Sequence, residues 1–128
     1  MFLSYIILPL VFLDQVAKLV AFKYFIYICN SLGVFGLAMG GIHVYLGVLL
    51  LVSYSIFIEK RKYVLVGLSF IFAGGLSNII DRLLYGCVRD FIRVLHFPTF
   101  NFADVFITIG VILVVFSLLT NKNDRYSF

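Results

Sequence analysis

Four long apolar segments constrain this chain more than any other feature of its sequence. Two of them, residues 34–58 and 63–80, contain no Asp, Glu, Lys or Arg. A helix needs about 20 apolar residues to cross a hydrocarbon core about 30 Å thick. Of the 128 residues, 63% are hydrophobic and only 12% are charged, so a water-soluble globule of this size could not bury its own apolar surface. The sequence therefore predicts an all-α integral membrane protein in which a single domain, residues 1–128, crosses the membrane four times.

We expect the four transmembrane helices at about residues 2–24, 36–58, 63–83 and 102–120. The first segment has no positively charged start and contains Asp14, Lys18 and Lys23, so it is expected to be a retained spanning helix and not a cleaved signal peptide. Because the connections between the segments are short, small extracytoplasmic loops are predicted.

The basic residues give a weak indication of orientation, with five on one side of the membrane and four on the other. The dense Lys60-Arg61-Lys62 cluster favours the cytoplasm. Both termini would then be cytoplasmic, and residues 81–99 would lie at the outer surface. The net charge of +4 is scattered between apolar segments, which indicates contact with anionic membrane lipids and no nucleic acid.

Three of the six acidic residues lie within residues 77–104. Two of them close the same pattern, Asn78-x-x-Asp81 and Asn101-x-x-Asp104, and Asp90 lies between. Counting along the third segment brings the chain to a membrane interface near Asp81. Because 16 uncharged residues follow Asp104, this residue is expected at the same interface. The carboxylates therefore cluster at one face of the membrane and do not line a path across it.

Two carboxylates that lie close together in a poorly hydrated site cannot easily both ionise. One can act as an acid while the other takes a proton from water, which is the chemistry of aspartic proteases and needs no metal or cofactor. Asn78, Asn101 and Arg82 could hydrogen-bond a substrate backbone or a developing oxyanion. Spacing alone nominates Asp81 and Asp104 as the pair. The alternative is an interfacial salt-bridge network without catalysis, formed by Asp81, Arg82, Arg89 and Asp90.

Asp14 and Lys18 are four residues apart, so they lie on one face of a helix and an ion pair between them is expected. A competing interpretation makes Asp14 the acid of a small four-helix proton-coupled cation or drug transporter. Transport should survive Asp90→Asn, whereas peptidase activity should vanish. A third interpretation is an inactive scaffold.

Cys29 and Cys87 are both expected near the outer face, where a disulfide is possible. The interpretation that we favour from sequence is that both are small apolar fillers near helix ends. No group of residues has the spacing of a metal site.

Four blocks of sequence occur in an order that resembles a known family. They are Asp14-Gln-Val-Ala-Lys18, Asn30-Ser-Leu-Gly-Val-Phe35, Asn78-Ile-Ile-Asp81-Arg82 with Gly86-Cys-Val-Arg-Asp90-Phe91, and Phe97-Pro-Thr-Phe-Asn101-Phe-Ala-Asp104. The family is lipoprotein signal peptidase, also called signal peptidase II. The first block is similar to its D-Q-x-x-K pattern, and the last block is similar to its F-P-x-F-N-x-A-D pattern. Within the third block, residues 86–91 are similar to its G-x-V-x-D-F pattern. The resemblance covers nearly the whole chain.

The resemblance implies that Asp90 and Asp104 are the catalytic pair, which replaces the pair that spacing nominates. Asp81 and Arg82 would form a supporting ion pair. The remaining matched residues would line the pocket or brace the first helix: Asn30, Gly33, Asn78, Asn101, Asp14 and Lys18.

The family removes signal peptides from bacterial prolipoproteins and cuts just before the diacylglyceryl-modified Cys. The resemblance therefore implies a multi-pass protein of the bacterial plasma (inner) membrane with its active site near the outer face. It also implies prolipoprotein substrates, contact with membrane lipids and inhibition by globomycin-type cyclic peptides, without a cofactor. The link at residues 24–29 is shorter than usual, so the family's sheet-like extracellular cradle is expected to be reduced.

Overall fold

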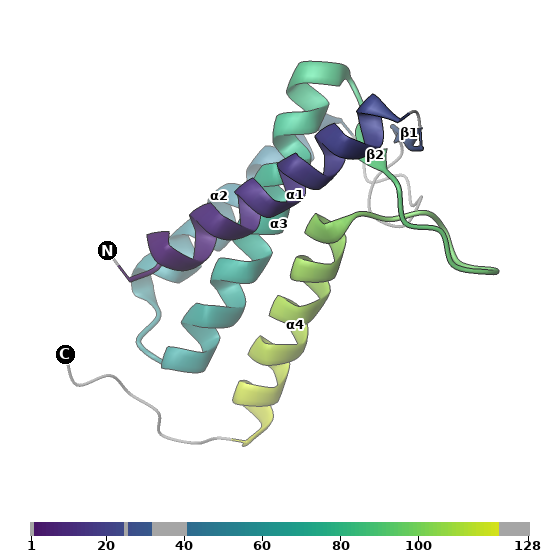
Figure 1. The fold of residues 1–128 in the computed structure, drawn as a ribbon. Coiled ribbons are helices and arrows are strands. Elements are labelled where there is room, and N and C mark those ends of the chain that lie inside the picture. Colours follow the sequence, from purple (N-terminus) through teal and green to yellow (C-terminus); the bar gives the residue numbers. More distant parts are fainter. Residues whose placement is uncertain (1, 25, 32–40, 121–128) are drawn as a thin grey trace.

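The computed structural model describes residues 2–24, 26–31 and 41–120. Four helices and two short strands follow one another along the chain (Figure 1). They are α1 (Ser4–Lys23), β1 (Ile28–Asn30), α2 (Ile42–Ile58), α3 (Lys62–Tyr85), β2 (Val88–Asp90) and α4 (Phe102–Thr120). The four predicted helices are therefore present. The predicted start of the second helix, residues 36–40, lies outside the described residues.

Three helices, α1, α3 and α4, are long and apolar enough to cross a membrane, as far as the described part of the chain shows. Helix α2 is apolar too but has only 17 described residues. Large apolar side chains face outward on these helices, and Phe57 is 88% and Leu119 80% exposed. Several charged residues are buried instead: Asp14, Lys18, Asp81, Arg89, Asp90 and Asp104. This distribution, with polar groups inside and apolar groups outside, is that of a protein surrounded by lipid.

Helix α3 lies at the centre of the bundle and contacts α1, α2 and α4. Its closest approach is to α4, where small residues meet. A methyl group added at Gly67 would lie 2.8 Å from the carbonyl oxygen of Gly110, and one added at Gly74 would overlap the carbonyl oxygen of Ala103. Small residues let helix backbones approach closely in a membrane, where water provides no hydrophobic driving force. The N-terminal end of α4 is thereby fixed against α3.

The two strands form a small antiparallel sheet that pairs Ile28 with Asp90 and Asn30 with Val88. This sheet, with three residues in each strand, is an addition to the predicted all-α fold. A disulfide joins Cys29 to Cys87, whose Cα atoms are 5.5 Å apart. The favoured interpretation of these cysteines as separate apolar fillers was therefore wrong. The bond ties the segment after α1 to the segment after α3.

Glycine ends α3 and turns the chain into β2. Gly86 has a φ of 73°, in the left-handed region that other residues disfavour, and its N–H donates to the carbonyl oxygen of Arg82.

After β2 the chain makes an arm that leaves the bundle and returns, seen at the right of Figure 1. Backbone bonds between Ile92 and Phe100 close this arm. It therefore brings Asn101 back to Asp90.

Candidate active site

A cluster of buried polar side chains occupies the end of the bundle where α1, α3, β2 and the start of α4 meet. Each of its members is at most 4% exposed. They are Asp14, Lys18, Ser77, Asn78, Asp81, Arg89, Asp90, Asn101 and Asp104. The structure thus brings together nearly all the site residues that the sequence predicts. Gly33 lies outside the described residues, and Asn30 joins the cluster at its half-buried edge.

The Asp90 carboxylate is held by two amide groups. Asn101 Nδ2 donates to its Oδ1 at 2.7 Å, and Asn30 Nδ2 donates to its Oδ2 at 2.9 Å. Burial raises the pKa of the Asp90 carboxyl to about 6. The charge of Asp104 adds to this rise in pKa, while the hydrogen bonds from the two amides oppose it. This carboxyl therefore gains a proton more readily than an exposed aspartate.

The Asp104 carboxylate is fixed by the cap of α4. Asn101 Oδ1 accepts from the Asp104 N–H at 3.0 Å, and Asp104 Oδ2 accepts from the Asn101 N–H at 3.2 Å. This is a reciprocal capping box, which satisfies donors that a helix start leaves free. Asp104 Oδ1 accepts from Asn78 Nδ2 at 3.0 Å. The Asn-x-x-Asp spacing is thus both a helix cap and a means of orienting the carboxylate.

The two asparagine amides also connect Asp90 to Asp104. Asn101 Nδ2 donates two hydrogen bonds, one to Asp90 Oδ1 and one to Asn78 Oδ1 at 3.1 Å. Neither carboxylate is in a salt bridge within the part of the chain that the structure describes. The charge of Asp104 raises the pKa of Asp90, and two buried carboxylates that interact in this way cannot easily both ionise, so that one can act as acid and the other as base. Within the described ranges no group of three or more His, Cys, Asp or Glu side chains could hold a metal ion.

The predicted Asp14–Lys18 ion pair is present, with Nζ 2.6 Å from Asp14 Oδ2. Asp14 Oδ1 also accepts from the backbone N–H of Ala103 at 2.9 Å, so α1 helps to cap α4. Lys18 Nζ donates to Asn78 Oδ1 at 2.9 Å. The pair therefore braces the first helix and supports the amide that holds Asp104.

The predicted ion pair between Asp81 and Arg82 is absent. Asp81 Oδ1 lies 2.8 Å from Arg89 Nη2, and Lys18 Nζ lies 3.7 Å from its Oδ2. Arg82 stacks on Tyr45 of α2, with its Cζ 3.9 Å from the ring centroid. Adjacent residues of a helix point about 100° apart, so Arg82 cannot turn back to Asp81. Of the four residues in the alternative salt-bridge network, only Asp81 and Arg89 pair, and Lys18 lies near the same carboxylate.

Three residues in or beside this cluster were not predicted as site residues: Ser77 and Arg89 of the cluster, and the half-buried Gln15 next to it. Gln15 Nε2 donates to Asp81 Oδ1 at 3.1 Å and to Ser77 Oγ at 2.9 Å. Ser77 Oγ donates to Asp14 Oδ2 at 2.6 Å. Ser77 is four residues before Asp81, so helix periodicity could have placed it on the same face. Gln15 follows Asp14 within the first matched block, and Arg89 was named together with Asp81 in the alternative salt-bridge network.

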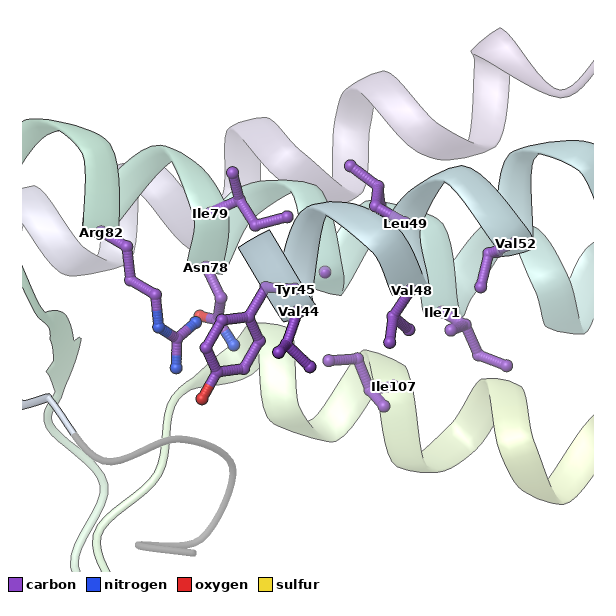
Figure 2. A pocket seen from close by; sticks show the side chains of 11 residues that line it. Val44, Tyr45, Val48, Leu49, Val52, Ile71, Asn78, Ile79, Arg82 and Ile107 are labelled. Atoms are coloured by element: carbon purple, nitrogen blue, oxygen red, sulfur yellow. The ribbon is translucent and has the colours of Figure 1, made fainter. Parts of the chain in front are cut away.

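An apolar cavity of about 140 Å³ lies between α2, α3 and α4. Figure 2 shows Asn78, Arg82 and Tyr45 at one end of it and Val52 and Ile71 at the other. Asn78 is the residue that donates to Asp104. The cavity therefore extends from the polar cluster along the apolar interior of the bundle.

Comparisons with known proteins agree with this geometry. A family model described as signal peptidase (SPase) II matches residues 6–120. A lipoprotein signal peptidase of Thermodesulfovibrio yellowstonii is 36% identical over 83% of this chain and 77% of the relative. The lipoprotein signal peptidase of Staphylococcus haemolyticus is 38% identical over 73% of this chain and 63% of the relative. That of Staphylococcus aureus is 43% identical over 61% of this chain and 54% of the relative. The chain thus matches little more than half of the length of some relatives.

Two solved structures, each described as a bacterial membrane enzyme studied by the in meso method, have the same fold. One has a TM-score of 0.80 at 27% identity and covers 98% of this chain and 94% of its own. The other has a TM-score of 0.81 at 29% identity and covers 94% of both chains. The interpretation as a transporter finds no support in these comparisons, and its proposed acid, Asp14, is fully buried against Lys18. The family match over residues 6–120 and the shared fold show that the chain belongs to the signal peptidase II family.

Proposed function

We propose that this chain is an aspartic endopeptidase that removes signal peptides from diacylglyceryl-modified bacterial prolipoproteins, cutting before the lipidated Cys. Its relatives carry the name lipoprotein signal peptidase. The observation that carries the proposal is the pair Asp90 and Asp104. Both are at most 4% exposed, both are held by asparagine amides, and neither takes part in a salt bridge among the described residues.

In the proposed mechanism the ionised member of the pair takes a proton from a water molecule, whose oxygen attacks the scissile carbonyl carbon. The protonated member donates a hydrogen bond to the carbonyl oxygen as negative charge develops there. When the C–N bond breaks, the pair returns a proton to the leaving amine. Asn78 and Asn101 hold the two carboxylates in position for both steps.

The apolar cavity next to Asn78 is proposed to receive an apolar side chain of the signal peptide. Arg82 and Tyr45 at its end would contact the more polar part of the substrate. Asn30 is proposed to steady the pair through Asp90. Gly33 remains predicted to line the substrate pocket.

We further propose four membrane-spanning helices with both termini in the cytoplasm of a bacterial inner membrane. The active site would then lie near the outer face, among lipids and within reach of globomycin-type inhibitors. The turn between α2 and α3, with Lys60 and Arg61, lies at the opposite end of the bundle from β1 and β2, and Lys62 begins α3 directly after it (Figure 1). This arrangement supports the proposed orientation, because basic loops remain in the cytoplasm.

The test is incubation of the purified protein with a diacylglyceryl-modified prolipoprotein, followed by a gel shift. We expect mature product from the wild type and a loss of at least about 10²-fold from Asp90→Asn and from Asp104→Asn. Glu59→Gln, at the far end of the bundle, is the matched control and should retain full activity. An inactive wild type, or an Asp104→Asn variant that cleaves normally, would disprove the proposal. Proton-coupled transport in vesicles that survives Asp90→Asn and fails in Asp14→Asn would instead favour a transporter.

A further inference from the structure

Arg89 is the middle residue of β2 and is 1% exposed. Both its backbone and its side chain bind the Asp81 carboxylate. The backbone N–H and Nε each donate to Asp81 Oδ2 at 3.0 Å, and Nη2 donates to Oδ1 at 2.8 Å. Three bonds between one residue and one carboxylate fix the strand to α3 at this point.

Two further contacts restrict the guanidinium of Arg89. Its Nη2 donates to Gln15 Oε1 of α1 at 3.1 Å, and its Cζ lies 4.3 Å from the centroid of the Tyr85 ring. Only the planar, forked guanidinium can bind a carboxylate through two nitrogens while it stacks on an aromatic ring. An ammonium group could keep the charge of this contact but not its geometry.

Asp90 directly follows this fixed residue. Because successive side chains of a strand point to opposite faces, Arg89 anchors β2 from one side while Asp90 faces the other. There, Asp90 meets Asn101 and Asn30. The cations that contact Asp81 are Arg89 and Lys18, and the described salt bridges of Arg89 do not include Asp90.

We propose that Arg89 is a positioning residue of this peptidase: its bidentate bond to Asp81 holds β2 so that Asp90 reaches Asn101 and the site of reaction. The inference rests on the proposed function.

The first test is Arg89→Lys, which keeps the positive charge but loses the forked bond. A displacement of about 1 Å at a reacting group can lower a rate about 10²-fold. We expect kcat to fall by about 10- to 100-fold and KM to stay within about 2-fold, because Arg89 acts through Asp90 in the proposal and does not contact the substrate. Arg93→Gln is the control, since Arg93 is exposed in the next loop and should behave like wild type.

A variant that loses Arg89 alone would leave Asp81 buried without its main cation, and the protein could fail to fold. The double variant Asp81→Asn with Arg89→Gln removes both charges and keeps similar side-chain shapes. We expect it to fold, with circular dichroism like that of wild type, and to show the same fall in kcat. If Arg89→Lys and the folded double variant both keep the wild-type kcat, Arg89 has no positioning role.

A measurement without substrate separates this inference from the proposed function. Reaction of the Asp90 carboxyl with a water-soluble carbodiimide, followed by mass spectrometry, reports whether the side chain has left its buried position. We expect labelling of Asp90 to increase at least about 5-fold in Arg89→Lys and to stay unchanged in Arg93→Gln. An inactive wild type would refute the proposed activity, whereas unchanged labelling of Asp90 in Arg89→Lys would refute the anchor.

Discussion

The four buried aspartates in the described part of the chain differ in the groups that lie beside them. Asp14 contacts Lys18 at 2.6 Å, and Asp81 contacts Arg89 at 2.8 Å. Asp90 and Asp104 receive hydrogen bonds from neutral amide groups instead. A cation beside a buried carboxylate stabilises its charge, whereas amides alone compensate for burial less completely. The first two aspartates are thus suited to hold the structure, and the other two to exchange a proton.

Asp90 should make the stability of the folded protein depend on pH. Burial raises the pKa of its carboxyl to about 6, whereas an unfolded aspartate has a pKa of about 4. The native state therefore binds a proton at Asp90 more tightly than the unfolded state does. This difference stabilises the folded protein fully below about pH 4, and the stabilisation is lost as the pH rises through about 6. A shift of about two pKa units corresponds to about 3 kcal/mol. We therefore expect Asp90→Asn, which resembles the protonated acid, to have a higher Tm than wild type at pH 7.5 while it is inactive.

Thermal unfolding followed by circular dichroism between pH 5 and pH 7.5 checks this prediction. The difference in Tm between Asp90→Asn and wild type should grow with pH. Glu59→Gln is the control, because the hydrogen bond from the Arg61 side chain lowers the pKa of Glu59 to about 2, outside this interval. If the Tm of Asp90→Asn lies below that of wild type at every pH, burial does not raise the pKa of the Asp90 carboxyl as stated.

Counting along the sequence predicted that Asp81, Asp90 and Asp104 would lie close together, and the structure buries all three in one cluster. The choice of Asp90 and Asp104 as the catalytic pair came from the family resemblance and stays a proposal.

The sequence was not sufficient to pair Asp81 correctly. Arg82 is the neighbour in sequence, but its helix position turns it toward Tyr45. Arg89 reaches Asp81 only because Gly86 ends α3 and reverses the chain. Such a contact depends on one turn whose geometry no local periodicity reveals.

Among the elements, α3 and α4 depend on small residues at seven-residue spacing. Gly67 and Gly74 of α3 face Gly110 and Ala103 of α4. We expect Gly74→Ala to destabilise the protein by about 1–3 kcal/mol, because the added methyl group would overlap the Ala103 carbonyl and push the start of α4 outward. Activity should fall with it, since Asp104 lies in that first turn.

Gly47→Ala is the matched control for this prediction. No atom lies within 4 Å of the methyl group it would add on α2, and alanine favours a helix by up to about 1 kcal/mol over glycine. Thermal unfolding should show an unchanged or higher Tm for Gly47→Ala and a lower Tm for Gly74→Ala. Equal Tm values for the two variants would mean that α3 and α4 are not packed as closely as described.

The small sheet depends on a bond that sequence could not establish. Strands of three residues show no alternation of apolar and polar side chains, and a pairing between positions 58 residues apart arises from tertiary structure. The disulfide holds β1, and with it Asn30, against β2. Cys29 is exposed, so a reductant can reach the bond although Cys87 is buried. The position of Asn30 beside Asp90 therefore depends on the oxidation state of these cysteines.

We expect a reductant to lower both the Tm and the activity of the wild type. A bond that closes a loop of this length can contribute up to about 4 kcal/mol in the chain-entropy description. The variant Cys29→Ser with Cys87→Ser should start at the lower Tm and activity and should not respond to the reductant. Equal activity of oxidised and reduced wild type would show that Asn30 keeps its place without the bond.

At the scale of the whole molecule, helices were predictable because composition alone requires them. A chain with this much apolar sequence must satisfy its backbone hydrogen bonds internally in lipid, and helices do so locally. The start of α2 was harder to predict than its end, because Glu59 follows its last residue, Ile58, whereas no charged residue lies between Lys23 and the helix. Orientation depends on a small difference in basic residues between the two sides. It is therefore the large-scale property that most needs a direct measurement.

Labelling of an introduced cysteine with a membrane-impermeant maleimide can measure the orientation. The native disulfide leaves no free cysteine among the described residues to compete for the label. Lys60 and Arg93 are exposed and lie near opposite ends of the bundle, in the α2–α3 turn and in the arm after β2. We expect Arg93→Cys to react in spheroplasts and Lys60→Cys only after the membrane is opened, because the basic turn remains in the cytoplasm. The reverse result would place Asp90 and Asp104 at the cytoplasmic face. A prolipoprotein whose lipidated Cys lies in the outer leaflet could not then reach them, so the same experiment tests the proposed substrate as well as the orientation.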